Sequence, residues 1–304
     1  MSQEQNPWSL YWSADRLHSC VAQATDQDQT VLNELWRSFA QSLDSGAKVL
    51  DLATGNGAVA SAMLAVRSDL DIDAVDKASI DPTSYLSGQE NLAAVRFHAD
   101  TDLFEMPFEL STFDAITSQF GIEYAGFSEA SSTVLSLLKP GGRFRYVVHH
   151  SQSDIIASSR VKVTELEQLT QVNGLLDTLI KVLRRETDFN ELEQLGAAYL
   201  EQDIVRTEAV SGQVFLGIEK IASGLQLRPK ESIELGVAMN LRVRSELSRL
   251  QQLLAAGRSE DEMLAWQQGL LSDAGISASF EPIVIDRQES LYLLGWLVSG
   301  QKPA

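Results

Sequence analysis

Cysteine, long apolar runs and an N-terminal signal sequence are scarce or absent in this chain. Cys20 is the only cysteine among 304 residues, so no intramolecular disulfide can form, and a reducing compartment is indicated. The opening segment Met1–Pro7 is polar, and the longest strongly apolar run, Leu291–Val298, is far shorter than the ~20 residues that span a bilayer. We therefore expect a cytoplasmic protein without a membrane partner.

Positive charge is also scarce, because 24 Lys and Arg residues stand against 42 Asp and Glu residues. The formal net charge is −18, and no basic block occurs. Proteins that bind nucleic acid usually carry a basic face, so this balance argues against DNA or large RNA as a partner. Hydrophobic residues make up 44% of the chain, which is enough for one sizeable core with an appended or inserted unit.

A glycine loop between a strand and a helix organises the first half of the chain. Val49–Leu52 has the composition of a buried parallel strand, Gly55 and Gly57 form a tight loop, and a helix is expected from Ala58 to Val66. Such a corner brings backbone N–H groups close to a ligand and favours negative charge. Asp51, at the end of the strand, would instead repel phosphate and could pair with a cation or an amine.

Further strands alternate with helices after this corner. The expected strands are Ile72–Val75, followed by Asp76, Val95–His98, followed by Asp100, Phe113–Thr117 and Arg143–His149. We expect helices at Gln29–Leu43 and at Ser128–Leu138, the latter with Ser128 as its N-cap, and a turn at Lys139–Gly142. This alternation predicts an α/β fold: a doubly wound, mostly parallel sheet with helices on both faces.

The last part of the chain combines a helical block with two closing strands. Apolar residues recur every three or four positions in two stripes: Leu166, Leu169, Val172, Leu176, Leu179 and Leu183, then Ile233, Val237, Leu241, Leu247, Leu250 and Leu254. Such stripes predict core-facing helices, which could also bury against a second subunit in a homodimer. Pro229 and Gly257 mark a helix start and end, and Ser259 with Glu262 predicts a capping box. Ser279–Ile285 and Ser290–Val298 predict an antiparallel pair.

These patterns divide the chain into three parts. Residues 1–46 form an N-terminal helical arm, whose aromatic residues either pack on the body of the protein or cover a ligand pocket. Residues 47–150 and 276–304 form the core around the parallel sheet. Residues 151–275 form a helical insertion.

The glycine loop permits two classes of cofactor. Gly55 to Ala60 satisfies the dinucleotide pattern G-x-G-x-x-G/A, and Asp76 lies near the distance expected for a ribose-binding acid, so an NAD-dependent oxidoreductase is one alternative. However, dinucleotide loops directly follow their strand, whereas Asp51 precedes Gly55 by four positions. A cofactor with a sulfonium and an ammonium group suits Asp51 better than a pyrophosphate does.

Four segments in order resemble the class I S-adenosylmethionine-dependent methyltransferase family. V-L-D-L-A-T-G-N-G (49–57) resembles motif I, with Ala53 where the family most often has a glycine, and D-A-V-D (73–76) resembles the ribose-binding motif. The stretches 98–108 with 113–116, and L-L-K-P-G-G-R-F (137–144), resemble the adenine-side loop with the fourth strand and the turn into the fifth strand. The resemblance covers about Lys48–His149 and the last two strands. It implies a seven-stranded Rossmann-like methyltransferase fold with an antiparallel last strand, and S-adenosyl-L-methionine as cofactor. Because this family commonly carries substrate-covering insertions between the fifth and sixth strands, the resemblance also implies that residues 151–275 are a substrate lid.

The resemblance also implies roles for residues along this edge. Gly55 and Gly57 would cradle the methionine part, Asp51 would lie near its ammonium group, and Asp76 would accept from the ribose hydroxyls. Asp100, with Thr101 beside it, would hold the adenine amino group, and Ser118 and Gln119 would lie near the methyl group. The expected cofactor-binding residues are Asp51, Ala53, Thr54, Gly55, Asn56, Gly57, Asp76, Lys77, Asp100, Thr101, Ser118 and Gln119. No metal is expected.

Acceptor-side residues are expected at the end of the fifth strand and in the N-terminal arm. His149 or His150 could act as general base, and alternation sends the two side chains to opposite faces, so at most one reaches the pocket. Substrate contacts are expected from Trp8, Tyr11, Trp12 and Tyr124. The N-P-P-Y-type signature of adenine or glutamine methylators is absent, since Ser118-Gln119-Phe120-Gly121 stands in its place. We therefore expect a small-molecule acceptor and O-methylation; a non-catalytic interaction protein that keeps the cofactor fold remains a further alternative.

Overall fold

The computed structural model describes residues 6–19, 26–202, 209–287 and 290–304. Cys20 lies outside these residues. The chain forms two compact units, and each is considered by itself below. Unit 1 comprises residues 1–157 and 253–304, and unit 2 comprises residues 158–252. The sequence-based boundaries at 150 and 275 differ from this division, because helix α11 (Glu260–Ala274) belongs to unit 1.

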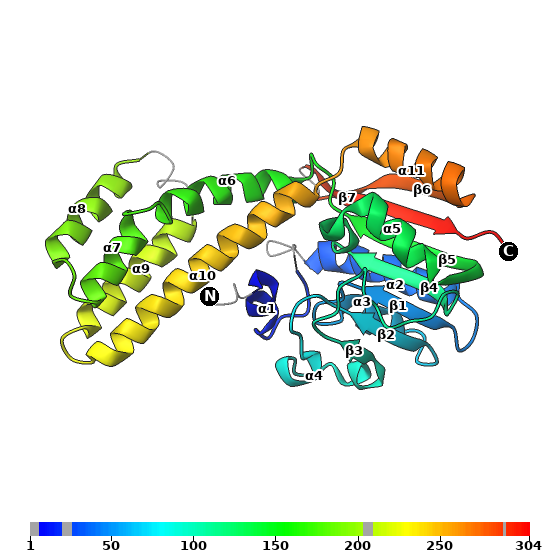
Figure 1. The fold of residues 1–304 in the computed structure, drawn as a ribbon, viewed down its shortest axis with the longest axis horizontal. Helices are drawn as coiled ribbons and strands as arrows, with labels where there is room; N and C mark the ends of the chain where they lie inside the picture. Colours follow the sequence, from blue (N-terminus) through cyan, green and yellow to red (C-terminus); the bar gives the residue numbers. More distant parts are fainter. Residues whose placement is uncertain (1–5, 20–25, 203–208, 288–289) are drawn as a thin grey trace. The chain divides into compact units, whose positions relative to one another are not determined.

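Unit 1 is built on one seven-stranded sheet (Figure 1). Its strands are β1 (Lys48–Leu52), β2 (Asp71–Val75), β3 (Arg96–His98), β4 (Phe113–Gln119), β5 (Leu138–Val148), β6 (Ser277–Asp286) and β7 (Leu291–Gln301). Their order is β3-β2-β1-β4-β5-β7-β6, and β7 runs antiparallel to both neighbours. The sequence therefore predicted all seven strands, the mostly parallel sheet and the antiparallel closing pair correctly.

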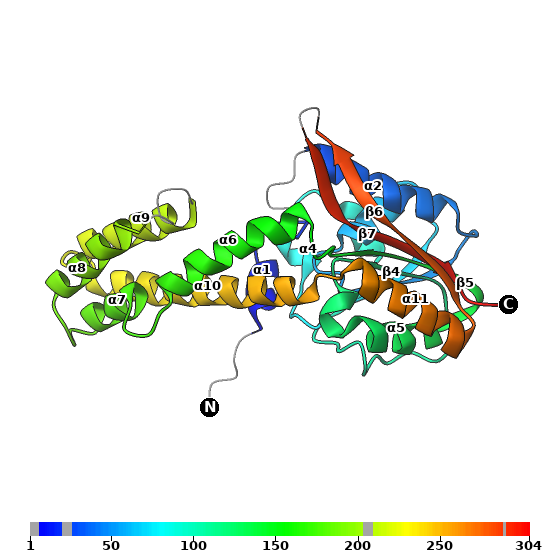
Figure 2. The same cartoon turned by 90° about the horizontal axis from the view of Figure 1, so that it is seen from above.

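Two apolar layers cover the faces of the sheet (Figure 2). On one face, helices α2 (Asp26–Gln41) and α3 (Ala58–Leu64) bury Trp36 and Met63 together with Val49 of β1. On the other face, α5 (Phe127–Ser136) and α11 bury Val134 and Trp266 together with residues that alternate along the strands. Burial on both faces is what the apolar β1 segment predicts for a central parallel strand.

Two local predictions in unit 1 were wrong. Lys139–Gly142 is not a separate turn but the first part of β5, because Gly141, with φ of 75°, donates its N–H to the carbonyl oxygens of Lys302 and Pro303. Helix α5 is capped by Gly126 and not by Ser128. Gly126 has φ of 83°, a backbone conformation that glycine adopts without steric cost, so the helix begins before the serine.

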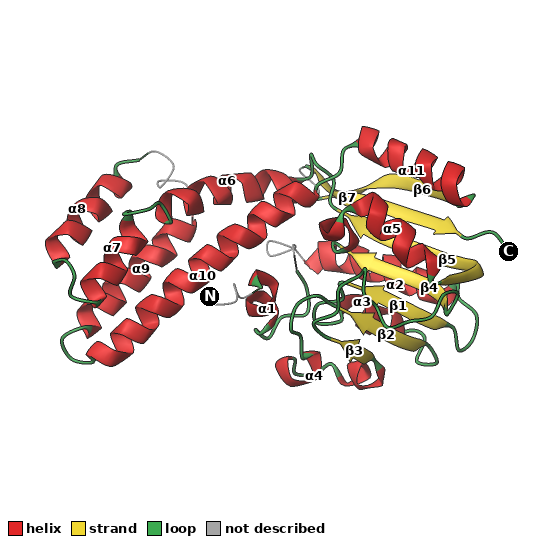
Figure 3. Ribbon diagram, in the orientation of Figure 1, coloured by secondary structure: helices red, strands yellow, loops and turns green. Residues whose placement is uncertain are grey.

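The regular secondary structure of unit 2, in its described residues, consists of helices joined by turns and loops (Figure 3). Its helices are α6 (Asp154–Leu169) and α10 (Pro229–Ala256), which both begin or end in unit 1, and α7 (Leu175–Leu183), α8 (Phe189–Leu200) and α9 (Ala209–Gly224). Pro229 and Gly257 bound α10 as predicted. The capping box of Ser259 and Glu262, at the start of α11 in unit 1, is also confirmed.

The predicted apolar stripes of the helical block are buried only in part. Leu166, Leu169, Leu176, Leu179 and Leu183 are buried as expected, as is Leu250. Val172 is exposed, and so are the three residues Ile233, Val237 and Leu241 on one side of α10. The core assignment was wrong for these four residues, because periodicity shows that a helix has an apolar side and does not show what covers it.

Candidate functional site

The carboxyl ends of four neighbouring strands meet at one edge of the sheet. Leu52 of β1 lies opposite Val75 of β2 and Ser118 of β4, and Val75 lies opposite His98 of β3. Immediately beyond these positions the backbone takes positive φ angles at three non-glycine residues: Ala53 (49°), Asp100 (53°) and Phe120 (51°). Such conformations cost free energy and cluster at functional sites, and in open α/β sheets ligands bind beyond the carboxyl ends of strands.

Asp76 closes the glycine loop from the end of β2. Its carboxylate accepts hydrogen bonds from the backbone N–H groups of Gly55, at 2.7 Å, and Ala78, at 2.8 Å. The side chain is buried, and burial raises the pKa of Asp76 from 3.8 to about 6, although the two backbone donors oppose that rise. The structure thus brings the expected ribose acid against the loop, with Gly57, φ of 84°, turning the chain into α3.

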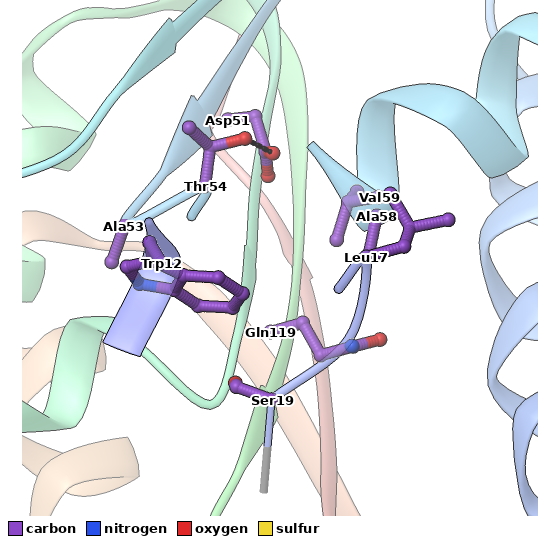
Figure 4. A pocket seen from close by; sticks show the side chains of 9 residues that line it. All are labelled: Trp12, Leu17, Ser19, Asp51, Ala53, Thr54, Ala58, Val59 and Gln119. Atoms are coloured by element: carbon purple, nitrogen blue, oxygen red, sulfur yellow. Dashed lines mark hydrogen bonds between the residues drawn. The ribbon is translucent and has the colours of Figure 1, made fainter. Parts of the chain in front are cut away.

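Asp51 is buried at the end of β1, where two threonines hold its carboxyl group. Thr54 Oγ1 donates to Asp51 at 2.6 Å (Figure 4). Thr117 Oγ1 donates to the same carboxyl group at 2.9 Å. Burial raises the pKa of Asp51 from 3.8 to about 7, the hydroxyl donors lower it, and the nearby Asp76 carboxylate adds to the rise. Thr117 was not among the expected site residues, and its position next to Ser118 was the available signal.

The expected adenine-side residues are only partly brought together. Thr101 donates its backbone N–H to the Asp76 carbonyl at 2.8 Å, and Asp100 is exposed and accepts from the Ser79 hydroxyl at 2.6 Å. Lys77 is exposed and pairs with Asp102 at 2.7 Å. Its backbone remains next to Asp76, whereas its ammonium group is taken up by that ion pair.

Ser118 and Gln119 also differ in placement. Ser118 is buried, and its hydroxyl donates to the Leu52 carbonyl at 3.1 Å and accepts from the Ile122 N–H at 3.0 Å, so it is used within the fold. Gln119 lines a pocket, where its side-chain oxygen accepts from Trp36 Nε1 at 2.6 Å.

One pocket lies directly beside the glycine loop, and Figure 4 shows its lining. The Trp12 indole lies in this view between Thr54 and Gln119. A methyl group built on Gly55 would overlap the Trp12 ring, so the indole rests directly on the loop. The pocket is lined by Trp12, Leu17, Ser19, Asp51, Ala53, Thr54, Ala58, Val59 and Gln119.

Helix α1 (Pro7–Trp12) places the aromatic residues of the arm along the same edge. Trp12 forms a buried cluster with Ala78 and Ile80, which follow β2. Trp8 meets Tyr124 edge to face, with ring centroids 5.3 Å apart, and Tyr11 contacts Trp12 at 5.1 Å. All four residues expected to contact substrate are therefore neighbours in space, although they come from two distant segments.

The two histidines after β5 lie in different surroundings, as alternation predicted. His149 is fully buried; its ring stacks on Phe120, with centroids 4.4 Å apart, and its Nε2 lies 3.2 Å from the Tyr124 hydroxyl. His150 instead stacks on Trp296 at 4.2 Å and accepts through Nδ1 from the Gln152 N–H. Of the two candidates for the base, only His149 is connected to the aromatic residues of the site.

Glu123 and Arg258 support His149 from two distant segments, and Arg258 was not an expected site residue. Glu123 Oε1 accepts from the His149 backbone N–H at 3.0 Å, and the Arg258 N–H donates to the His149 carbonyl at 2.8 Å. The pKa of Glu123 is raised to about 7 because the carboxyl group is buried, while the positive charge of Arg258 acts against that rise. No sequence signal links these positions, since 135 residues separate Glu123 from Arg258.

The polar groups of this edge suit S-adenosylmethionine in kind. Asp76 and Asp100 offer acceptors for ribose and adenine donors, the loop offers backbone groups, and Asp51 offers a carboxyl group. The space above Gly55 is taken by Trp12, so the donor set fits the cofactor while the conformation of α1 does not leave it room. In the described ranges no cluster of three or more metal-ligating side chains occurs, and no helix has the length and apolarity to cross a membrane.

A comparison with known protein families matches the part of the chain that forms this edge. Residues 49–142 match a family model described as "Methyltransferase domain". No curated protein matches the chain.

Three solved structures illustrate the similarity. A candidate methyltransferase of Haloferax volcanii, solved with the Trm112 activator, is 20% identical at a TM-score of 0.33, over 43% of this chain and 61% of that one. Geranyl diphosphate methyltransferase with sinefungin is 16% identical at 0.34, over 39% and 44%. The plantazolicin methyltransferase BpumL with S-adenosylhomocysteine is 10% identical at 0.49, over 93% and 88%. The chain thus spans less than two thirds of the first two.

The family match covers the strand, glycine loop and acids described above, and the sheet around them has the expected antiparallel seventh strand. Residues 49–142 are therefore similar to a methyltransferase domain, in agreement with the motifs that resemble the class I S-adenosylmethionine-dependent family.

Proposed function

We propose that this protein transfers a methyl group from S-adenosylmethionine to a hydroxyl group of a small-molecule acceptor. The observation that carries the proposal is the joined arrangement of Asp76, the Gly55–Gly57 loop and Asp51 at one sheet edge. When bound there, the cofactor would supply an electrophilic methyl group on a sulfonium. The protein's contribution is then mainly to align an acceptor with that methyl group.

The residues of the edge divide the binding work between them. Asp76 would exchange its hydrogen bond from the Gly55 N–H for donors of the ribose, and the freed N–H would face the ligand. Asp100 and Thr101 would hold the adenine side, with Ala53, Asn56 and the Lys77 backbone completing the loop region. Asp51, held by Thr54 and Thr117, would favour the ammonium group.

Next to the aromatic residues of α1, Tyr124 and His149 would together accept the proton of the acceptor hydroxyl. His149 is fully buried and Tyr124 half-buried, so Tyr124 stands between the imidazole and an acceptor. In this arrangement the acceptor hydroxyl donates to the Tyr124 oxygen while Tyr124 donates to His149 Nε2. Glu123 fixes the backbone of His149. In this conformation Trp8 and Tyr11 cover the Tyr124 side of the site with an apolar surface, which favours an apolar or aromatic acceptor.

Calorimetric titration with S-adenosylmethionine, comparing the unchanged protein with Asp76→Asn, tests the proposal. Loss of a charged acceptor is worth about 1.5–3 kcal/mol, so the variant should bind about 10- to 100-fold more weakly. Asp273→Asn is the matched control, because it removes an exposed carboxylate at the end of α11. Binding of NADH but not of S-adenosylmethionine would favour the oxidoreductase alternative instead. Binding without methyl transfer to any acceptor would favour the interaction protein.

We extend the proposal to a homodimer formed through the helical insertion. The exposed residues Ile233, Val237 and Leu241 lie four positions apart and form an apolar side of α10. Sedimentation velocity of the unchanged protein and of Val237→Glu measures the association. A monomer at all concentrations contradicts the dimer and leaves the proposed activity unaffected.

A further inference from the structure

Helix α1 covers the place that the resemblance gives to the cofactor, from the Gly55–Gly57 loop to the segment that follows Asp76. The Trp12 indole rests on Gly55, where the loop leaves room only because the residue has no side chain. The same indole is buried against Ala78 and Ile80, which follow the ribose-binding acid Asp76, with Ala99 packed beside it ahead of Asp100. The indole packs on apolar residues between Asp76 and Asp100, where the resemblance places adenosine.

Hydrogen bonds hold α1 in this place through the binding loops themselves. The Asn56 side chain donates to the carbonyl oxygens of Trp12, at 3.0 Å, and Arg16, at 2.8 Å. At the other side, Ser79 donates its N–H to the Ser9 hydroxyl at 2.9 Å, and Asn6 donates to the Lys77 carbonyl at 3.3 Å. The loops that are expected to bind the cofactor therefore hydrogen-bond to α1 and the residues next to it instead.

The state of Asp76 agrees with a closed site. Its two carboxylate oxygens already accept from Gly55 and Ala78, and the side chain is buried although it ends its strand at the open edge of the sheet. An acid that binds ribose hydroxyls needs an open approach. The cover over this acid is α1, because the cluster around Ala78 contains Trp12, with Trp8 and Tyr11 packed against it.

We propose that α1 is an intramolecular inhibitor, in which Trp12 stands in for the nucleoside and must leave before S-adenosylmethionine binds. This inference rests on the proposed function and adds a regulation of the same site. Because only molecules with α1 displaced are competent to bind, the apparent affinity is the intrinsic affinity reduced by the open fraction. An open fraction of about 1% weakens the apparent affinity about a hundredfold.

The aromatic contacts connect this closed state to the acceptor side. Trp8, one turn before Trp12, packs against Tyr124, whose hydroxyl lies 3.2 Å from His149 Nε2. Displacement of α1 would therefore expose the Tyr124 ring and the expected nucleoside site at the same time. One helix thus keeps both halves of the site closed.

The test measures S-adenosylhomocysteine binding by calorimetry, with no need for an acceptor. The combined variant Asn6→Ala and Ser9→Ala removes two side chains that tie α1 to the loops and replaces none of the expected cofactor-binding residues. Loosening an inhibitor should tighten binding at least threefold. Ser13→Ala is the matched control, because the Ser13 hydroxyl donates only within the arm, to the Leu10 carbonyl. Unchanged binding overturns the inference, and weaker binding also does so, since it would make α1 a lid that closes over bound cofactor.

A reversible crosslink gives a second test in which each sample is its own control. Ser9→Cys with Ser79→Cys, in a Cys20→Ser background, should lock α1 when oxidised, because the Ser9 hydroxyl lies against the Ser79 backbone. Binding should be at least a hundredfold weaker in the oxidised protein and should return on reduction. Equal binding in the two states overturns the inference while the proposed function stands.

Trp12→Ala separates failure of the inference from failure of the proposed function. This substitution removes the indole from the expected nucleoside site and leaves Asp76 unchanged. S-adenosylhomocysteine should then bind at least tenfold more tightly, with a faster association rate. If this variant alone binds, the inhibitor is established. If neither the unchanged protein nor the variant binds, the proposed function fails and the inference falls with it.

Discussion

Individual carboxyl groups in this protein have pKa values that are shifted in opposite directions. Asp51, Asp76 and Glu123 are buried carboxyl groups at one sheet edge, and burial raises the pKa of each above its ordinary value. The opposite holds in the middle of β2, where the Arg96 guanidinium hydrogen-bonds the Asp73 carboxylate and lowers its pKa although burial acts against it. Raised pKa values of several carboxyl groups at one edge are typical of functional sites.

A stability measurement against pH follows from Asp51. Its folded-state pKa of about 7 lies above the ordinary 3.8, so the folded protein binds the proton more tightly than the unfolded chain does. This group therefore lowers the free energy of unfolding as pH rises from about 4 through 7, by at most ~4 kcal/mol. Asp51→Asn carries no titratable group there.

Chemical denaturation between pH 5 and 8 tests that expectation. The free energy of unfolding of Asp51→Asn, relative to the unchanged protein, should increase with pH across this range. Groups with lowered pKa values, such as Asp69, lose their contribution only in more acidic solution and cancel in the difference. A difference that stays flat with pH would show that Asp51 does not titrate in this window.

At the scale of elements, helix ends follow local sequence rules where a side chain can act as a cap. Ser259 accepts from the Glu262 N–H at 3.3 Å, and Glu262 accepts from the Ser259 N–H at 2.7 Å. Ser259→Ala should lower the free energy of unfolding by about 1 kcal/mol, because the first turn of α11 loses an acceptor. Ser272→Ala, near the other end of α11, is the control and should change stability by less than half as much. Thermal unfolding of the two variants side by side decides this.

At the scale of the whole molecule, the division into two units predicts that unit 1 folds without unit 2. The chain leaves unit 1 after residue 157 and returns at residue 253. The segments of unit 1 next to these two points are close together, since the Ser151 N–H donates to the Arg258 carbonyl and Gly257 lies against Ile156. A chain in which a short flexible linker replaces residues 158–252 should unfold cooperatively and bind S-adenosylhomocysteine like the full chain. Calorimetric scans and titration measure both properties. Loss of cooperative unfolding would show that unit 1 depends on the insertion.

Strand positions, the glycine loop and the acids at the strand ends could be predicted from sequence because each depends on residues next to one another. A short apolar run that is buried on both faces defines a strand such as Val49–Leu52, and a single capping box defines the start of α11. The family motifs lie within one continuous segment, 49–142, for the same reason. Local order was therefore sufficient for the fold class and for much of the candidate site.

What the sequence alone determined is the sheet, its cofactor-type corner and the presence of two helical stripes. Only the tertiary structure decided that Trp12 lies on Gly55, that His149 and not His150 meets Tyr124, and that Ile233, Val237 and Leu241 remain exposed. Each of these depends on which distant segment covers a given surface. Side-chain period and turn chemistry fix the direction of a side chain relative to its own element, whereas the identity of its neighbour is set by packing of the whole unit.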